Sequence, residues 1–254
     1  MATEDSAGLK EQVALANRAL HHYGLASYMG HASARIPGTD RVLIRPRSYM
    51  GMDQVTAGMI VTIDLEGNII DAPGGARVPD GWSLHTEIYK ARPDVCGVAH
   101  THQKWCTVFG IAGQTILPVH HPSRSSVVYP AYGVYDHDSD TAGTVEQGRA
   151  VAKALGSGVG CHLRNHGVVI VGIDVQEAVA AAVNAEHQAE MNWLAMQAGE
   201  REEIPERYMR RSIERRFVRR EKEKHEGIER DNWGNLFTWA DQDREVVRFR
   251  RVQL

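Results

Sequence analysis

The stretch LHTEIYKARPDVCGVAHTH, residues 84–102, joins an amphipathic segment to an apolar run that ends in two histidines. Leu84 and Ile88 lie four residues apart, which predicts a helix over residues 82–92 with both side chains inward. Pro93 ends that helix, and the apolar run VCGVA after it predicts a buried strand. The stretch therefore indicates an α/β fold with paired histidines near the carboxyl end of a strand.

These histidines are His100 and His102, with one threonine between them. Successive side chains of a strand point to opposite faces, so residues two apart share a face and their imidazoles converge. The pair can hold a metal ion, or both can be ordinary polar residues at a strand end. A third histidine would favour an open catalytic metal site, which commonly uses three protein ligands. His166 is the candidate, because Gly167 permits a tight backbone path beside it.

The rest of the chain alternates helical and strand-like segments and is of a size that one core can organise. Further helices are expected over residues 7–23, 143–155 and 175–197, and strands within residues 42–70 and on both sides of residues 165–167. We expect one domain, although two small domains are compatible with the length.

A change of composition marks the C-terminal part of the chain. Residues 201–230 contain 11 Lys or Arg and 8 Asp or Glu, which is typical of a solvated helix. The polar tail after it carries three large aromatic side chains, Trp233, Phe237 and Trp239. Such side chains indicate docking, for instance on another subunit. We expect residues 1–200 to form the body and residues 201–254 a charged helical extension and tail of the same domain.

Charge and composition bear on partners and location. A net charge of −3 does not favour binding to nucleic acid, and no apolar run reaches the roughly 18 residues of a membrane span. The first residues, MATEDSAGLKEQ, carry acids where a signal peptide has basic residues. Three widely spaced cysteines do not suggest a disulfide framework. We therefore expect a cytoplasmic protein with no nucleic-acid or membrane partner.

Three motifs occur together in a recognisable order: GHASAR at residues 30–35, the stretch 84–102 and NHGVVIVG at residues 165–172. In this order and at these separations they resemble the class II aldolase/adducin family, over roughly residues 8–200. The resemblance implies a three-layer α/β/α sandwich around a mainly antiparallel sheet. It also implies a homotetramer with active sites at subunit interfaces, which the C-terminal segment can reach.

By this resemblance, His100, His102 and His166 match the family's three metal-binding histidines. The resemblance thus implies one divalent transition metal per subunit. Imidazole ligands suit Mn, Zn, Fe or Co and do not choose among them.

Two departures from the sugar-phosphate aldolases of the family concern the reaction. Those enzymes carry a glutamate just before the helix, where it exchanges the substrate proton, and here that place holds Gly81. Glycine has no proton to exchange, unless Asp80 takes over by a one-residue shift. Gly30 and His31 stand where the aldolases show Gly-Asn in the first binding turn. The GHxSxR turn resembles that of the family's decarboxylases, which act on hydroxylated aromatic or heteroaromatic acids.

Candidate site residues follow from these motifs and their surroundings. The catalytic candidates are His31, His121 and Asp80, and the candidates for substrate binding are Arg35, Arg47, Arg124 and His85. Arginine suits a carboxylate as readily as a phosphate. Each candidate has a structural alternative: a turn hydrogen bond for His31, a surface ion pair for the arginines, and a buried supporting role for His85.

We expect a metal-dependent carbon-carbon lyase, and in particular a decarboxylase of a small hydroxy-aromatic or heteroaromatic carboxylic acid. A metal ion that polarises a ring hydroxyl can draw off the charge left on the ring when carbon dioxide departs, so no substrate proton need be abstracted first. One alternative is a class II aldolase acting on a hydroxy-aldehyde or sugar phosphate, with Asp80 or a water as base. Others are a non-catalytic adducin-like binding protein and a ferrous iron enzyme that uses dioxygen.

Overall fold

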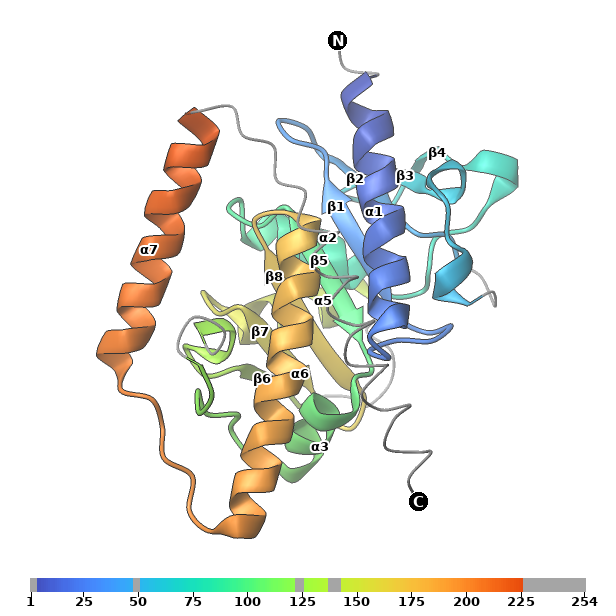
Figure 1. Cartoon of the computed structure of the whole chain (residues 1–254). Helices are drawn as coiled ribbons and strands as arrows, with labels where there is room; N and C mark the ends of the chain where they lie inside the picture. The colour runs from blue at the N-terminus through green and yellow to red at the C-terminus, as the bar shows by residue number, and fades with distance from the viewer. Residues whose placement is uncertain (1–3, 48–50, 122–125, 137–142, 226–254) are drawn as a thin grey trace, which may run out of the picture.

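An eight-stranded sheet forms the centre of the molecule. The computed structural model describes residues 4–47, 51–121, 126–136 and 143–225 (Figure 1). The strands are β1 His31–Arg35, β2 Arg41–Ile44, β3 Val61–Asp64, β4 Ile69–Asp71, β5 Gly97–Thr101, β6 Gly133–Tyr135, β7 Gly160–Leu163 and β8 Gly167–Gly172. Their order in the sheet is β4-β3-β2-β1-β5-β8-β7-β6. Within these described strands every neighbouring pair is antiparallel except β6 and β7.

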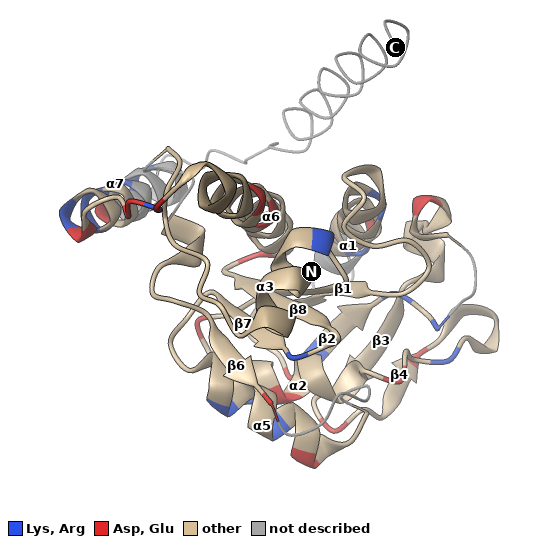
Figure 2. Cartoon of the chain, turned by 90° about the horizontal axis from the view of Figure 1, so that it is seen from below, with Lys and Arg blue, Asp and Glu red and all other residues tan. Residues whose placement is uncertain are grey.

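Helices cover both faces of this sheet. They are α1 Glu4–His22, α2 Trp82–Ala91, α3 Lys104–Ala112, α5 Val145–Leu155, α6 Val175–Ala198 and α7 Glu206–His225, with short 3-10 turns η1 Met52–Gln54, η2 Ala57–Met59, η3 Pro73–Gly75 and η4 Ser126–Val128. Figure 2 shows α1 and α6 on one face and α2 and α5 on the other. Helix α3 joins the α1 and α6 layer through buried Cys106 and Phe109. The expected three-layer α/β/α sandwich is thereby confirmed.

Strand alternation sorts the core into two layers. In β8, Val168 and Ile170 pack with α1 and α6, whereas Val169 and Val171 pack with α2 and α5. A strand covered on both faces can be apolar at every position, which explains the run VVIV. This buried strand lies beside β5 and so supports the strand that carries the paired histidines.

Most of the expected elements are confirmed with shifted ends. Helix α6 begins after Asp174, whose side chain accepts a hydrogen bond from the backbone N–H of Glu177, and ends before Gly199. The expectation of a turn over residues 30–35 is wrong, because residues 31–35 form β1. The strand predicted from the run VCGVA begins at residue 97, and it includes His100. None of the described helices is both long and apolar enough to cross a membrane.

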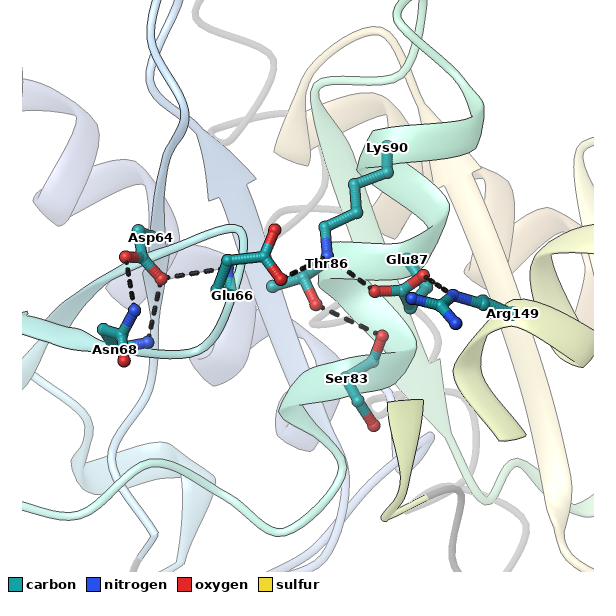
Figure 3. A network of polar contacts seen from close by, with 8 residues as sticks. All are labelled: Asp64, Glu66, Asn68, Ser83, Thr86, Glu87, Lys90 and Arg149. Atoms are coloured by element: carbon teal, nitrogen blue, oxygen red, sulfur yellow. Dashed lines mark hydrogen bonds and ion pairs between the residues drawn. The ribbon is translucent and has the colours of Figure 1, made fainter. Parts of the chain in front are cut away.

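A polar network fixes helix α2, which carries site residues, to its neighbours (Figure 3). Glu87 is 4% exposed, and its carboxylate contacts Lys90 at 2.8 Å and Arg149 of α5 at 3.1 Å. Lys90 also reaches Glu66, in the turn between β3 and β4, at 3.1 Å. A buried carboxylate is costly unless it is paired, so these contacts favour one position of α2 between α5 and the β3–β4 turn.

Candidate metal and substrate site

Three histidines from two separate segments meet at one end of the central strands. His100 is in β5, His102 follows the end of that strand, and His166 lies in the turn between β7 and β8. Asn165 adopts the left-handed conformation in this turn, with φ of 61°. Each histidine offers one ring nitrogen, and the three nitrogens lie within 4.8 Å of one another. The structure thus brings together the pair predicted from the spacing and the third histidine that the family resemblance implies.

Backbone contacts fix two parts of this triad. Nδ1 of His100 lies 3.2 Å from the carbonyl oxygen of Val168, so Nδ1 carries the proton and Nε2 is left with its lone pair. Gly167 passes so close to Thr101 that a β carbon there would overlap the carbonyl of Thr101 and approach the ring of His102. The prediction that Gly167 is needed for a tight path is therefore confirmed.

Two of the three histidines, His100 and His102, are held in the neutral form that suits a metal ion. Burial, followed by the charges of neighbouring histidines, lowers the pKa of His100 well below its usual value. Burial and then the charge of His166 lower the pKa of His102 to about 4. Neutral imidazole is the form that binds metal, and three imidazoles with one ring already oriented are a donor set for a divalent transition metal. The residues present fit the expected ion.

A pocket of about 250 Å³ opens beside the triad. Its walls come from residues 28–31, 45–47 and 79–81 together with the three histidines. It therefore brings together His31, Arg47 and Asp80 of the sequence-predicted candidates. The pocket places these side chains next to the position that a metal would take.

Two arginines give this pocket positive charge. Arg45 is 2% exposed and donates hydrogen bonds to the carbonyl oxygens of Tyr28 and Gly30 at 3.2 Å each. Arg47 pairs with Asp80 at 2.9 Å at the more exposed side of the pocket. Sequence reasoning chose Arg47 and missed Arg45. The missed signal was its position directly after the apolar strand VLI, the same feature that identified His100 and His102.

The ring of His31 takes the place of a side chain at position 81. A β carbon built on Gly81 would lie 3.1 Å from Nε2 of His31, a tight contact. His31 also faces His100 across the β1–β5 pairing, with ring centroids 5.2 Å apart. The position of the His31 ring therefore depends on the absence of a side chain at residue 81.

His85 lies behind His31 and does not reach the pocket. It is fully buried, and its two ring nitrogens contact Nδ1 of His31 and Oγ of Ser33, each at 2.6 Å. Because both nitrogens are occupied, the supporting role fits this position better than direct binding of substrate. The sequence does not single out Ser33, because the family resemblance predicts a turn over residues 30–35, where the structure has a strand. In a strand, Ser33 shares a face with His31.

The remaining candidates lie elsewhere. Arg35 is at the other end of β1, where its guanidinium stacks on the ring of Tyr89 at 5.0 Å and donates to the Tyr89 carbonyl. Gln188 of α6 holds the backbone of His120, the residue before His121, and His121 does not line this chain's pocket. Arg124 lies outside the described residues, as do Trp233, Phe237 and Trp239.

We predict that acid destabilises the fold before it protonates the buried histidines. Burial, with a smaller effect of His100, lowers the pKa of His85 to about 3, and burial lowers that of His162 to about 4. The unfolded chain takes up these protons at about pH 6.5, so the free energy of unfolding falls as the pH drops from there toward 4. The slope should be about 1.4 kcal/mol per pH unit for each histidine.

Urea unfolding at a series of pH values measures this slope. Replacing His162 by glutamine should flatten it, because the burial that lowers the pKa of His162 then no longer contributes. A free energy of unfolding that stays constant between pH 6.5 and 4 would contradict the assignment of both rings as neutral in the folded state.

Comparison with known proteins agrees with this geometry. The family model of the Class II Aldolase and Adducin N-terminal domain matches residues 11–193. In the solved structure of an L-fuculose 1-phosphate aldolase from Glaciozyma antarctica PI12, 84% of that chain aligns with 85% of this one at 24% identity and a TM-score of 0.73. This likeness concerns the fold alone.

Three curated relatives carry different activities in their names. A 3,4-dihydroxyphthalate decarboxylase from Arthrobacter keyseri is 32% identical over 76% of this chain and 81% of its own length. A 5-methylthioribulose-1-phosphate/5-deoxyribulose-1-phosphate aldolase from Rhodospirillum rubrum is 31% identical over 69% of this chain and 76% of its own. For a Caulobacter vibrioides protein named for aldolase class 2, the identity is 34%, and the match spans 58% of this chain and 56% of that relative.

Proposed function

This chain belongs to the class II aldolase and adducin family, and from that premise we propose that it decarboxylates a small hydroxy-aromatic or heteroaromatic carboxylic acid. It is a lyase of the class II aldolase superfamily, in which both aldolases and an aromatic-acid decarboxylase occur among the relatives. The choice between these reactions depends on the chemistry of its own pocket. The metal, Mn, Zn, Fe or Co, is part of the proposal.

One observation carries the proposal: the ring of His31 fills the space beside Gly81. In the aldolases of the family this is the place of the proton-exchanging glutamate. A histidine in that space removes a carboxylate base and offers a hydrogen-bond donor instead. Decarboxylation of a hydroxy-acid needs a donor and an electron sink, and it does not need a base that first removes a proton from carbon.

In the proposed decarboxylation, each pocket residue has a separate role in binding or orienting the substrate. Arg45 and Arg47 hold the substrate carboxylate, and His31 donates a hydrogen bond that orients it. A divalent ion on the triad would act as a Lewis acid that stabilises negative charge on the substrate. The bond between ring carbon and carboxylate breaks, its electron pair stays on the ring, and carbon dioxide leaves. A proton from water then takes its place on the ring carbon.

Release of carbon dioxide from hydroxylated aromatic acids tests this proposal. Full-length protein loaded in turn with Mn, Zn, Fe or Co should release carbon dioxide from at least one such acid and leave one hydroxy-arene per molecule released. Arg45→Gln should raise KM at least tenfold, because a charge-assisted hydrogen bond is worth about 1.5–3 kcal/mol. Substrate turnover without carbon dioxide release would overturn the proposal.

An aldolase is the second candidate, and the position of Asp80 supports it. This carboxylate lines the pocket next to Gly81 and could serve as the base that glycine cannot provide. Formation of dihydroxyacetone phosphate from a sugar phosphate, lost in Asp80→Asn, would favour this reaction.

The assembly belongs to the same proposal. His121 does not line the pocket of its own subunit. In a homotetramer with active sites at subunit interfaces, His121 would contact the pocket of a neighbouring subunit. The tail over residues 230–254, which lies outside the described residues, is a second candidate for such a contact. Removing it should lower activity, and an active truncated monomer would contradict the interface.

A further inference from the structure

A series of four hydrogen-bonded side chains extends from the pocket into the core between β1 and α2. Nδ1 of His31 lies 2.6 Å from Nε2 of His85, and Nδ1 of His85 lies 2.6 Å from Oγ of Ser33. Oγ of Ser33 then lies 2.8 Å from the hydroxyl of Tyr89. His31 is 7% exposed and the other three residues are at most 1% exposed, so most of this series of hydrogen bonds is shielded from bulk solvent.

Each contact in the chain needs one proton between its two atoms. Two facing ring nitrogens at 2.6 Å cannot both carry a proton, and two lone pairs would repel each other. The direction of one hydrogen bond therefore sets the direction of the next. Oγ of Ser33 could also accept from both neighbours, but its own proton would then have no acceptor among the described residues. Two arrangements remain: every group donates toward His31, or every group donates toward Tyr89.

The Tyr89 end favours the first arrangement. Its hydroxyl is buried, and within the described part of the chain Ser33 is the side chain it contacts by a hydrogen bond. Burial raises the pKa of this phenol, so it keeps its proton and needs an acceptor for it. If Ser33 donated to Tyr89, the phenol proton would have no acceptor, and buried polar hydrogens are rarely left so.

We infer that Tyr89, Ser33 and His85 are positioning residues that hold His31 in the tautomer with its proton on Nε2. Tyr89 donates to Ser33, Ser33 donates to Nδ1 of His85, and Nε2 of His85 donates to Nδ1 of His31. The remaining N–H of His31 then faces the space beside Gly81, at the pocket.

This tautomer decides what His31 can do. A ring nitrogen binds a metal ion through its lone pair, so an N–H at Nε2 keeps His31 out of the ligand set although it lies beside His100. The three-histidine site then keeps a position open for substrate. The role as donor to a carboxylate oxygen rests on the proposed function, whereas the tautomer itself rests on the hydrogen bonds alone.

Nitrogen-15 NMR of the histidine rings tests the tautomer directly. In the full-length protein loaded with diamagnetic Zn, long-range proton-nitrogen correlations distinguish a protonated ring nitrogen, a bare one and a metal-bound one. A His31→Gln variant assigns the His31 signals. We expect protonated Nε2 and bare Nδ1 at His31. Protonated Nδ1, or Nε2 bound to Zn, would overturn the inference.

A pair of serine variants tests the chain behind His31. Ser33→Ala removes the donor to His85, so a second population of His31 with protonated Nδ1 should appear, and kcat should fall roughly 10- to 100-fold with unchanged Zn content. Ser83→Ala is the matched control. Ser83 is also a buried serine, but it donates to the carbonyl of Thr144 and is not part of this series of hydrogen bonds. An unchanged His31 tautomer in folded Ser33→Ala would contradict the relay of hydrogen bonds.

The NMR result does not depend on turnover. If no hydroxy-acid loses carbon dioxide while His31 carries its proton on Nε2, the proposed function fails and the tautomer stands. If decarboxylation is found with Nε2 bound to Zn, the proposed function stands and the positioning role fails.

Discussion

Replacing His100 by alanine is expected to abolish metal binding and, with it, turnover of any substrate. His100 is the buried member of the triad, and its Nδ1 is already fixed by the carbonyl of Val168. Loss of an outer hydrogen-bond partner of a ligand costs about 10- to 100-fold in metal affinity, so loss of the ligand itself should cost more than about 100-fold. Elemental analysis after dialysis, beside titration with Zn and Mn, measures this loss.

The control for His100→Ala is a buried strand histidine outside the site. His162 of β7 is 2% exposed and is not part of the triad, so His162→Gln should keep about one metal per chain. Circular dichroism checks that both variants are folded. Full metal content in folded His100→Ala would show that the ion, if any, is bound elsewhere.

Introducing glutamate at position 81 is expected to reduce decarboxylation by at least roughly 100-fold, because a misplacement of about 1 Å in an active site costs that much. The new β carbon would lie 3.1 Å from Nε2 of His31, which requires a shift of a few tenths of an ångström. The rest of the glutamate side chain needs further space there and would displace the ring more. The added carboxylate would also repel an anionic substrate and compete for Arg45 or Arg47. Steady-state rates of carbon dioxide release measure the effect.

A matched substitution separates this effect from the chemistry of glutamate itself. Gly8 of α1 has open space where a β carbon would go, so Gly8→Glu adds the same group without displacing a neighbour, and its rate should be unchanged. Joining Gly81→Glu to His31→Gly should relieve the crowding but should not restore decarboxylation, since the donor is then absent. Unchanged carbon dioxide release in Gly81→Glu would contradict the assigned role of the His31 and Gly81 pair.

The fold could be predicted from sequence where a local pattern decides the structure. Asp174 and Gly199 mark the two ends of α6 because caps depend on the residue itself. The family resemblance predicts a turn at residues 30–35, because Gly30 and His31 stand where the aldolases show a binding turn. In the fold, pairing with β2 and β5 on both sides makes them a central strand. That pairing is set by distant parts of the chain.

In the site too, features that depend on neighbouring residues could be predicted, and contacts between distant segments could not. The paired histidines were predictable because two residues of one strand share a face, and His166 was found with the help of the family resemblance. The contact between His31 and Gly81 joins residues 50 positions apart, and nothing in either segment predicts it. Arg45 and Ser33 had a local signal, namely their place along a strand, that was not used.

The long separation between His102 and His166, 64 residues, bears on the order of folding. The two segments meet only when β8 pairs with β5, and closing so long a loop costs entropy before any contact rewards it. An ion that meets the unfolded chain finds only His100 and His102 close together, whereas the folded chain offers all three. An ion bound by the triad would therefore slow the unfolding of the protein and would not speed its folding.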